Sequence, residues 1–327
     1  MFESILSFID RHNSFILTTH DYLDADGLGS ELVLRSILKK REKPARIINV
    51  SVIPENLEFL LKDTVHEKYD KDIHLSLFEN SAVIILDTSN ENHLGIIKED
   101  VKKAEEVFFF DHHEQNPCST LKGFSDTTAS STSELAIELA CFLEVEIDPV
   151  TATAAYAGIV YDSGFFAYPK TSIRTFNAAI RTLEWGASPN YIYRQLMENS
   201  SYASMLLQRQ ALLNMEFIVG KKIAVIVLRK NDYEITGADY EESENIVNIP
   251  LRTKETEVSI LIKENPKGDI RCSLRSKGMV DVSKIARDLG GGGHVTAAGF
   301  RSSSGIDSTL KKLLADIKAQ LDLCGEQ

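Results

Sequence analysis

The sequence has little cysteine. Its 327 residues hold four cysteines, none of which forms a Cys-x-x-Cys pair: Cys118, Cys141, Cys272 and Cys324. Such sparse and widely spaced thiols do not form a disulfide framework, and the reduced thiols of a cytoplasmic protein are the simplest interpretation.

Long apolar runs, internal repeats and low-complexity tracts are also missing. No stretch approaches the ~20 apolar residues that a helix needs to span a bilayer. The amphipathic pattern of the first fifteen residues is interrupted by Glu3, Asp10 and Arg11, which does not fit a secretory signal. We therefore expect a soluble, cytoplasmic protein with no membrane partner.

The chain lacks an excess of positive charge. Lys and Arg number 36 against 48 Asp and Glu, which gives a formal net charge of −12. A surface of this charge repels a long nucleic-acid duplex, whereas a small anionic substrate drawn to bound metal ions remains compatible with it.

The length predicts two domains, because a single core seldom grows beyond roughly 250–300 residues. In the first, candidate strands alternate with helical segments, a pattern that predicts an α/β fold with a Rossmann-like, mostly parallel sheet: 14–19, 46–50, 82–86 and 107–110. Shorter strands follow residue 221 and predict a smaller α+β domain: 223–228, 257–263 and 270–274. We expect domains at 1–188 and 219–327, with a helical linker at 189–218.

Polar groups follow three of the candidate strands. Asp111-His112-His113 comes directly after the apolar run 107–110, and Asp87 directly after 82–86. Because the carboxyl ends of parallel strands share one edge of a sheet, these side chains are expected to converge.

A third group, His20, Asp24 and Asp26, lies between the first strand and the helix that follows it. Helix capping would explain one of the two carboxylates. Capping leaves the second carboxylate close to the first, so the two negative charges repel each other. A bound cation relieves that repulsion. Asp162, followed by Ser163 and Gly164, is open to either interpretation, since it could simply end a helix.

Carboxylates and imidazoles without thiolates suit Mn²⁺ or Mg²⁺ better than a structural Zn²⁺. The donors exceed what one ion needs, and two ions ~3.5–4 Å apart can clamp a phosphoryl group. The predicted chemistry is metal-assisted hydrolysis of a phosphate ester or anhydride. Residues 131–134 have capping-box spacing, and we expect no chemistry there.

The second domain carries Arg275-Ser276 and four consecutive glycines, 290–293, followed by His294. Glycines allow backbone amides to approach an anion closely, so we expect anion binding, although a flexible hairpin is the alternative.

These motifs, in this order, resemble those of the DHH-family phosphoesterases along nearly the whole chain. The resemblance implies a DHH catalytic domain, a DHH-associated substrate-binding domain and an active-site cleft between them. One Mn²⁺ would be bound by His20 and Asp24, and a second by Asp26, His112 and Asp162, with Asp87 bridging both.

The resemblance also implies roles beside the metals. Asp111 would orient His112, and His113 would contact the scissile phosphate. The substrate's other end would be held by residues of the second domain: Arg275, Ser276, Gly291, Gly292, Gly293 and His294.

Within the family, the likeness is greatest to the nanoRNase group. That likeness implies hydrolysis of two- to five-nucleotide RNA and of adenosine 3′,5′-bisphosphate, with two Mn²⁺ (or Mg²⁺) and a possible homodimer. Two alternatives stay open: a stand-alone phosphodiesterase of cyclic di-AMP or linear pApA, and a catalytically silent nucleotide-binding sensor.

Overall fold

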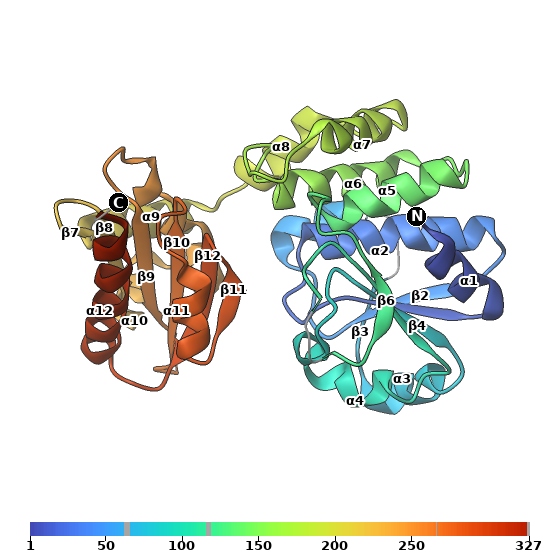
Figure 1. Cartoon of the computed structure of the whole chain (residues 1–327), viewed down its shortest axis with the longest axis horizontal. Helices are drawn as coiled ribbons and strands as arrows, with labels where there is room; N and C mark the ends of the chain where they lie inside the picture. Colours follow the sequence, from blue (N-terminus) through green and yellow to red (C-terminus); the bar gives the residue numbers. More distant parts are fainter. Residues whose placement is uncertain (62–65, 116–118, 266, 326–327) are drawn as a thin grey trace. The chain divides into compact units, whose positions relative to one another are not determined.

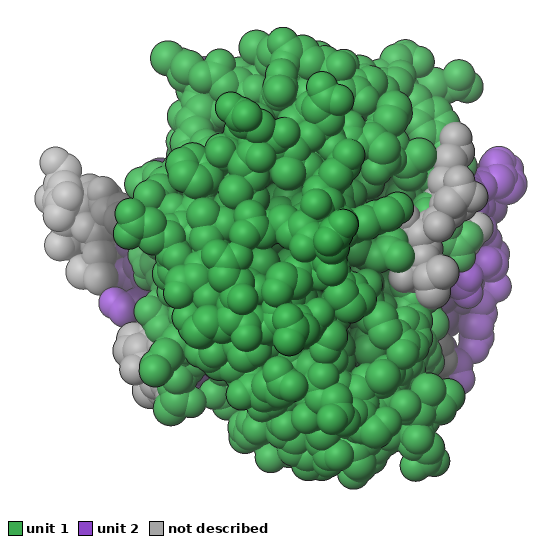
Figure 2. Space-filling model, turned by 90° about the vertical axis from the view of Figure 1, so that its right-hand side faces the viewer, with its two compact units in different colours: residues 1–199 green, residues 200–327 purple. Residues whose placement is uncertain are grey.

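The computed structural model describes residues 1–61, 66–115, 119–265 and 267–325. The chain divides into two compact units, Met1–Asn199 and Ser200–Gln327 (Figure 2). Helix α8 (Pro189–Met197) belongs to the first unit and α9 (Tyr202–Leu213) to the second. The role of residues 189–218 as a linker stays a prediction.

The first unit is built on a six-stranded sheet in the order β3-β2-β1-β4-β5-β6, with every neighbouring pair parallel. The predicted mostly parallel α/β sheet is therefore confirmed. Its strands are β1 (Phe15–Thr18), β2 (Ala45–Asn49), β3 (His66–Lys68), β4 (Ala82–Leu86), β5 (Val107–Asp111) and β6 (Lys122–Ser125).

Helices cover both faces of this sheet (Figure 1). One layer holds α2 (Ala25–Lys40), α5 (Thr132–Phe142) and α6 (Pro149–Asp162), and the other holds α3 (Lys71–Phe78) and α4 (Lys98–Val101). Residues 107–110 of β5 are all apolar because both faces of the strand are buried: Phe108 and Phe110 enter one core, while Phe109 enters the core on the opposite face. The remaining elements of the unit are α1 (Glu3–Arg11), η1 (Glu55–Leu60), η2 (Glu91–Ile97) and α7 (Ile173–Glu184).

Helix α2 approaches α6 closely at Gly29. A Cβ atom there would lie 2.6 Å from the carbonyl oxygen of Ala154 and 2.8 Å from Oγ of Ser133. The contact with Ala154 is to backbone, so it cannot be relieved by a side-chain rotation. Gly29 is therefore required by packing.

We expect Gly29→Ala to lower the free energy of unfolding by about 2 kcal/mol, because overpacking outweighs the ~1 kcal/mol that alanine gains over glycine inside a helix. Urea unfolding of the variant measures this. Lys39→Ala, at an exposed position of the same helix, is the control and should change stability by less than about 0.5 kcal/mol. A Gly29→Ala protein as stable as wild type would contradict the packing argument.

The second unit contains another six-stranded sheet, in the order β11-β12-β10-β9-β8-β7, in which only β8 and β9 are parallel among the described strands. One face packs against α11 (Val282–Asp288) and α12 (Ile306–Gly325), and the other against α9, α10 (Lys230–Thr236) and η3 (Tyr240–Asn248). A short turn, η4 (Pro250–Arg252), precedes β9. The strands are β7 (Glu216–Ile218), β8 (Ile223–Leu228), β9 (Val258–Glu264), β10 (Ile270–Ser276), β11 (Gly292–His294) and β12 (Ala297–Ser302).

Two further sequence expectations concern membrane-spanning helices and the cysteines. In the described part of the chain, no helix is both long enough and apolar enough to cross a membrane. Cys141 and Cys272 are free thiols. Cys118 and the side chain of Cys324 lie outside the described residues.

Candidate metal centre

Three central strands of the first sheet end side by side. His20 lies two residues after β1, Asp87 directly follows β4, and Asp111 is the last residue of β5. Strand β1 is hydrogen-bonded to β2 on one side and to β4 on the other, so the order of strands reverses here. In parallel α/β sheets, ligands bind at the carboxyl ends of the strands at such a switch point.

Asp87 occupies the middle of this edge. Its Oδ2 lies 3.4 Å from Nε2 of His20, and its Oδ1 lies 3.5 Å from Nε2 of His112. The same His112 nitrogen lies 3.0 Å from Oδ2 of Asp162, and Nε2 of His20 lies 3.7 Å from Oδ2 of Asp24. Asp87 is thus flanked by an imidazole and a carboxylate on each side.

These side chains form overlapping sets of three donors, each with its donor atoms within 4.8 Å of one another. Asp87 belongs to two of the sets. The sets are His20 with Asp24 and Asp87, Asp26 with His112 and Asp162, and Asp87 with His112 and His113. Nε2 of His112 is buried and points at the carboxylates of Asp87 and Asp162, as expected of an imidazole nitrogen that binds a metal ion. Groups of this kind can hold a divalent cation.

The electrostatics of the cluster also favour a bound positive charge. Burial and, to a smaller extent, the negative charge of Asp162 raise the pKa of Asp26 to about 6. Burial, together with the charge of Asp26, raises the pKa of Asp87 well above its usual range. Burial would lower the pKa of His112, but a hydrogen bond to Asp162 and its charge raise it to about 9. Protons or cations are needed to compensate these crowded carboxylates.

Asp24 shows that capping and metal binding are compatible. It is the N-cap residue of α2, and its Oδ1 accepts hydrogen bonds of 3.0 Å from the backbone N–H groups of Asp26 and Gly27. Its Oδ2 faces His20. One carboxylate therefore starts the helix and contributes to the cluster.

Asp26 is completely buried and is held by the N-terminus of α5. The backbone N–H of Thr132 donates to its Oδ2 at 2.7 Å, and that of Ser133 donates to its Oδ1 at 2.8 Å. The hydroxyl of Thr132 also donates to Oδ1 of Asp87 at 2.9 Å. A helix N-terminus stabilises the negative charge of Asp26 in this arrangement.

Thr132 is therefore a residue of the centre that sequence reasoning missed. We expected only capping from residues 131–134, and Ser131 does cap α5, since its Oγ accepts from the backbone N–H of Glu134 at 3.0 Å. Nothing in the local sequence indicates that Thr132 meets Asp26, 106 residues earlier. Only the docking of α5 against α2 brings them together.

Asp111 contacts a different imidazole from the one expected. We predicted that it orients His112. Its Oδ1 accepts from the backbone N–H of His112 at 2.8 Å and lies 2.8 Å from ring Nδ1 of His113. The other ring nitrogen of His112 faces the carbonyl of Ala129 at 3.4 Å. Burial alone would raise the pKa of Asp111, but its hydrogen bond with His113 keeps that pKa below the usual value.

A second buried network supports the loop that carries His20. Oδ1 of Asn49 accepts from the hydroxyl of Thr18 at 3.1 Å and from the backbone N–H of Thr19 at 3.0 Å. The Asn49 amide donates in turn to Oε2 of Glu31 at 3.0 Å. Burial raises the pKa of Glu31 to about 8, against a smaller lowering by that hydrogen bond. Glu31 is thus neutral at pH 7, and it fixes the side chain of Asn49, which in turn holds the backbone just before His20.

Comparison with known proteins matches this architecture in both units. Residues 14–160 match the model of the DHH family, N-terminal domain, and residues 219–322 match the DHHA1 domain. The chain belongs to the DHH family. It is a phosphoesterase of that family, with an amino-terminal DHH domain and a DHHA1 domain in the second unit.

The relatives of this DHH protein include two kinds of enzyme. It is 29% identical over 308 residues, 93% of this chain and 94% of the relative, to the "Probable bifunctional oligoribonuclease and PAP phosphatase NrnA" of Streptococcus mutans. It is 25% identical over 321 residues, 93% of this chain and 47% of the relative, to the cyclic-di-AMP phosphodiesterase GdpP of Bacillus subtilis.

A solved structure shares the fold of this DHH protein. The exopolyphosphatase-related protein of Bacteroides fragilis superimposes with a TM-score of 0.91 at 24% identity, covering 98% of this chain and 96% of the other.

In the DHHA1 domain, most of the predicted substrate contacts lie on β10 and β11, the two strands that flank β12. Arg275 of β10 and His294 of β11 are both register partners of Ala297 on β12. Ser276 is buried, and its hydroxyl donates to the carbonyl of Val280 at 2.7 Å, which closes a turn. The Ser276 hydroxyl therefore has a structural role, which we did not predict. Its contact with substrate stays a prediction.

Gly292 and Gly293 of the glycine run lie in β11, the first strand of an antiparallel hairpin with β12. A Cβ at Gly291 would lie 2.1 Å from the carbonyl oxygen of Gly299, and one at Gly293 would lie 2.4 Å from that of Ala297. A Cβ at Gly292 would meet no atom within 4 Å. Close packing of β11 on β12 therefore explains Gly291 and Gly293, and the anion contact predicted for all three glycines stays a prediction.

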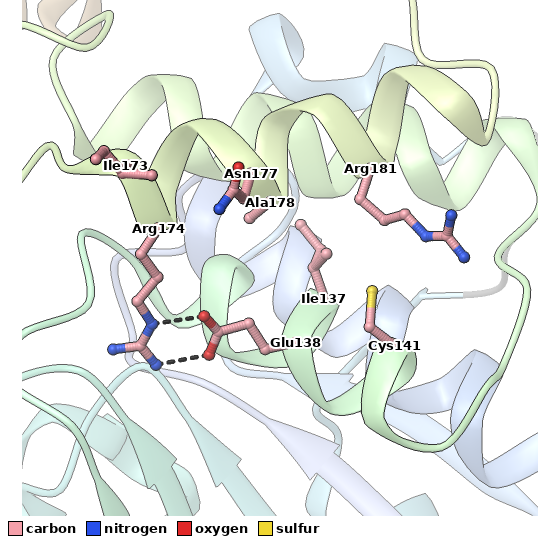
Figure 3. Close-up of a pocket in the computed structure, with 8 residues that line it drawn as sticks. All are labelled: Ile137, Glu138, Cys141, Ile173, Arg174, Asn177, Ala178 and Arg181. Atoms are coloured by element: carbon pink, nitrogen blue, oxygen red, sulfur yellow. Dashed lines mark hydrogen bonds and ion pairs between the residues drawn. The ribbon is translucent and has the colours of Figure 1, made fainter.

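A groove between α5 and α7 of the first unit is lined by none of the metal-centre residues (Figure 3). Arg174 crosses one end of it and donates to both carboxylate oxygens of Glu138, at 2.5 and 2.6 Å, and to Asp126 at 2.7 Å. These carboxylates neutralise the guanidinium of Arg174. Its lining residues are Ile137, Glu138, Cys141, Ile173, Arg174, Asn177, Ala178 and Arg181.

Proposed function

We propose that this DHH phosphoesterase uses two Mn²⁺ ions to hydrolyse RNA of two to five nucleotides and adenosine 3′,5′-bisphosphate. The observation that carries the proposal is the position of Asp87, with an imidazole and a carboxylate on each side. The resemblance to an oligoribonuclease and PAP phosphatase over nearly the full length of both chains supports the choice of substrate.

The residues present fit two divalent ions. His20 and Asp24 would hold one, and Asp26, His112 and Asp162 the other, with Asp87 between them. Bound divalent ions supply an activated water and neutralise charge on the phosphoryl group. Within the chain, Thr132 fixes Asp26 and Asp87, and Asp111 fixes the ring of His113, which we propose faces the scissile phosphate.

The remote end of the substrate is assigned to the DHHA1 domain. Arg275 offers a planar, permanently charged fork that suits a phosphate. Its register partner on β12 is Ala297, and His294 on β11 is the next residue in the same row across the sheet. We propose that Ser276, Gly291, Gly292 and Gly293 shape this site, and that it selects short substrates with a second phosphate.

A turnover panel tests the proposal. The purified protein, supplemented with Mn²⁺, is given 5′-phosphorylated diadenylate, an RNA five-mer, adenosine 3′,5′-bisphosphate, cyclic di-AMP and pyrophosphate. We expect rapid release of mononucleotides from the linear RNAs and of phosphate from the bisphosphate, with activity lost in a chelator and restored by Mn²⁺.

Two other outcomes favour the alternatives. Equal turnover of cyclic di-AMP and the linear dinucleotide would support a signalling phosphodiesterase, a possibility that the likeness to GdpP keeps open. Tight binding of nucleotides without turnover of any substrate would support a silent sensor.

A further inference from the structure

A left-handed turn begins two residues after Asp162. Gly164, Phe165 and Phe166 have φ values of 57°, 57° and 64°. Glycine adopts this conformation readily, but two consecutive phenylalanines do not. Strained backbone of this kind persists only where the surrounding structure enforces it, and it is concentrated at functional sites.

Several contacts enforce the turn. Oγ of Ser163 accepts from the backbone N–H of Phe166 at 3.0 Å, and the carbonyl of Ser163 accepts from that of Tyr168 at 2.9 Å. The ring of Phe166 stacks on that of Phe176 with centroids 5.0 Å apart. The ring of Tyr168 covers Gly164 so closely that a Cβ there would lie 2.5 Å from its Cζ.

Phe165 is exposed, whereas Phe166 packs against the core of the first unit. The Phe165 side chain is turned outward and is 39% exposed, although burial is the usual state of phenylalanine. The ring of Tyr193 on α8 meets it edge to face, with centroids 6.0 Å apart and an interplanar angle of 80°. Tyr193 is itself 47% exposed. Together the two rings form an exposed aromatic corner.

The corner is tied to the candidate metal centre at both ends of its loop. Asp162 precedes it, and Phe165 follows within three residues, no more than about 11 Å along an extended chain. At the other end, Nζ of Lys170 donates to the carbonyl of His112 at 3.3 Å. The loop that presents Phe165 therefore leaves the centre and returns to it.

We propose that Phe165 and Tyr193 form the stacking site for one nucleobase of the substrate. A phosphodiester held at the metal centre carries a base on the adjoining ribose, and aromatic side chains stack on bases of any sequence. The edge-to-face contact orients Phe165 and leaves area on the rings for a planar ligand. This inference rests on the proposed function, because it assumes a nucleotide substrate.

The test compares 5′-phosphorylated diadenylate with two analogues, each carrying an abasic ribose at one of its two positions. In the Mn²⁺-loaded enzyme, Phe165→Ala should raise KM for diadenylate by about tenfold or more with little change in kcat, since stacking contributes equally to ground and transition states. For the analogue without the stacked base, wild type and variant should have the same KM.

Two variants serve as controls. Phe165→Tyr keeps an aromatic ring and should retain the wild-type KM. Phe142→Ala removes another exposed ring, 64% exposed on α5, and should change KM for none of the substrates. An unchanged KM of Phe165→Ala for diadenylate would overturn the proposal, as would an equal rise for all three substrates.

A binding measurement separates this proposal from the proposed function. Titration calorimetry with AMP on the Mn²⁺-loaded protein needs no turnover. About tenfold weaker binding of AMP to Phe165→Ala than to wild type supports the stacking site even if no RNA is cleaved, and equal affinity overturns it. Failure of wild type to cleave any nucleotide would instead overturn the proposed function.

Discussion

Asp87→Asn is expected to abolish metal-dependent turnover. Asn keeps the shape of Asp, tolerates the left-handed backbone of residue 87 (φ 61°) and can still accept the hydrogen bond from Thr132. It removes the negative charge that lies between His20 and His112. The loss should exceed the roughly 100-fold in metal affinity or activity that loss of a group behind a metal ligand costs.

The measurement is kcat on diadenylate at saturating Mn²⁺, together with the metal affinity by calorimetry. Asp10→Asn, at an exposed position paired with Arg41, is the matched control and should retain wild-type activity. Circular dichroism checks that the Asp87→Asn protein is folded. A rate within tenfold of wild type would contradict the central position of Asp87 in the metal centre.

Glu31→Gln is expected to remove a large part of the pH dependence of stability. Burial raises the pKa of Glu31 to about 8 from its ordinary 4.5. Between these values the folded protein holds a proton that the unfolded chain has lost. The wild type should therefore lose about 1.4 kcal/mol of stability per pH unit in this window, on the order of 5 kcal/mol across it.

Below pH 4.5 the contribution of protonated Glu31 is fully present, and above pH 8 it is lost. The glutamine side chain of the variant stays neutral at every pH, so its advantage over wild type should grow from pH 5 to 8 in urea unfolding curves. Replacing the exposed Glu3 by glutamine should give a curve parallel to that of wild type. A constant difference between Glu31→Gln and wild type across this range would contradict a neutral Glu31.

Several strands of both units could be predicted because they are defined by the local sequence. The apolar runs at 82–86 and 223–228 became β4 and β8 with the same bounds, since continuous buried runs between polar turns leave few alternatives. Short strands such as β3 and β11 lack that signal. The edge strand β11, built from glycines and a histidine, is held by its pairing with β12.

Some residues of the candidate metal centre could likewise be predicted from the sequence, and others could not. His20, Asp87 and His112 could be anticipated because each follows a strand of a parallel sheet, whose geometry brings their ends together. Thr132 could not, because its contacts with Asp26 and Asp87 depend on how α5 docks. The pairing of Asp111 with His113 instead of His112 depends on the path of the chain after β5, and sequence spacing does not determine it.

The order of the donor groups along the chain has a consequence for synthesis in the cell. His20 is made early, whereas Asp162 and the α5 residue Thr132 follow much later. At about 5–20 residues per second, on the order of ten seconds pass between the first and last donor. A ribosome-bound chain shorter than 162 residues lacks part of the donor set. The complete set of donors therefore exists only late in synthesis, after the chain has passed Asp162.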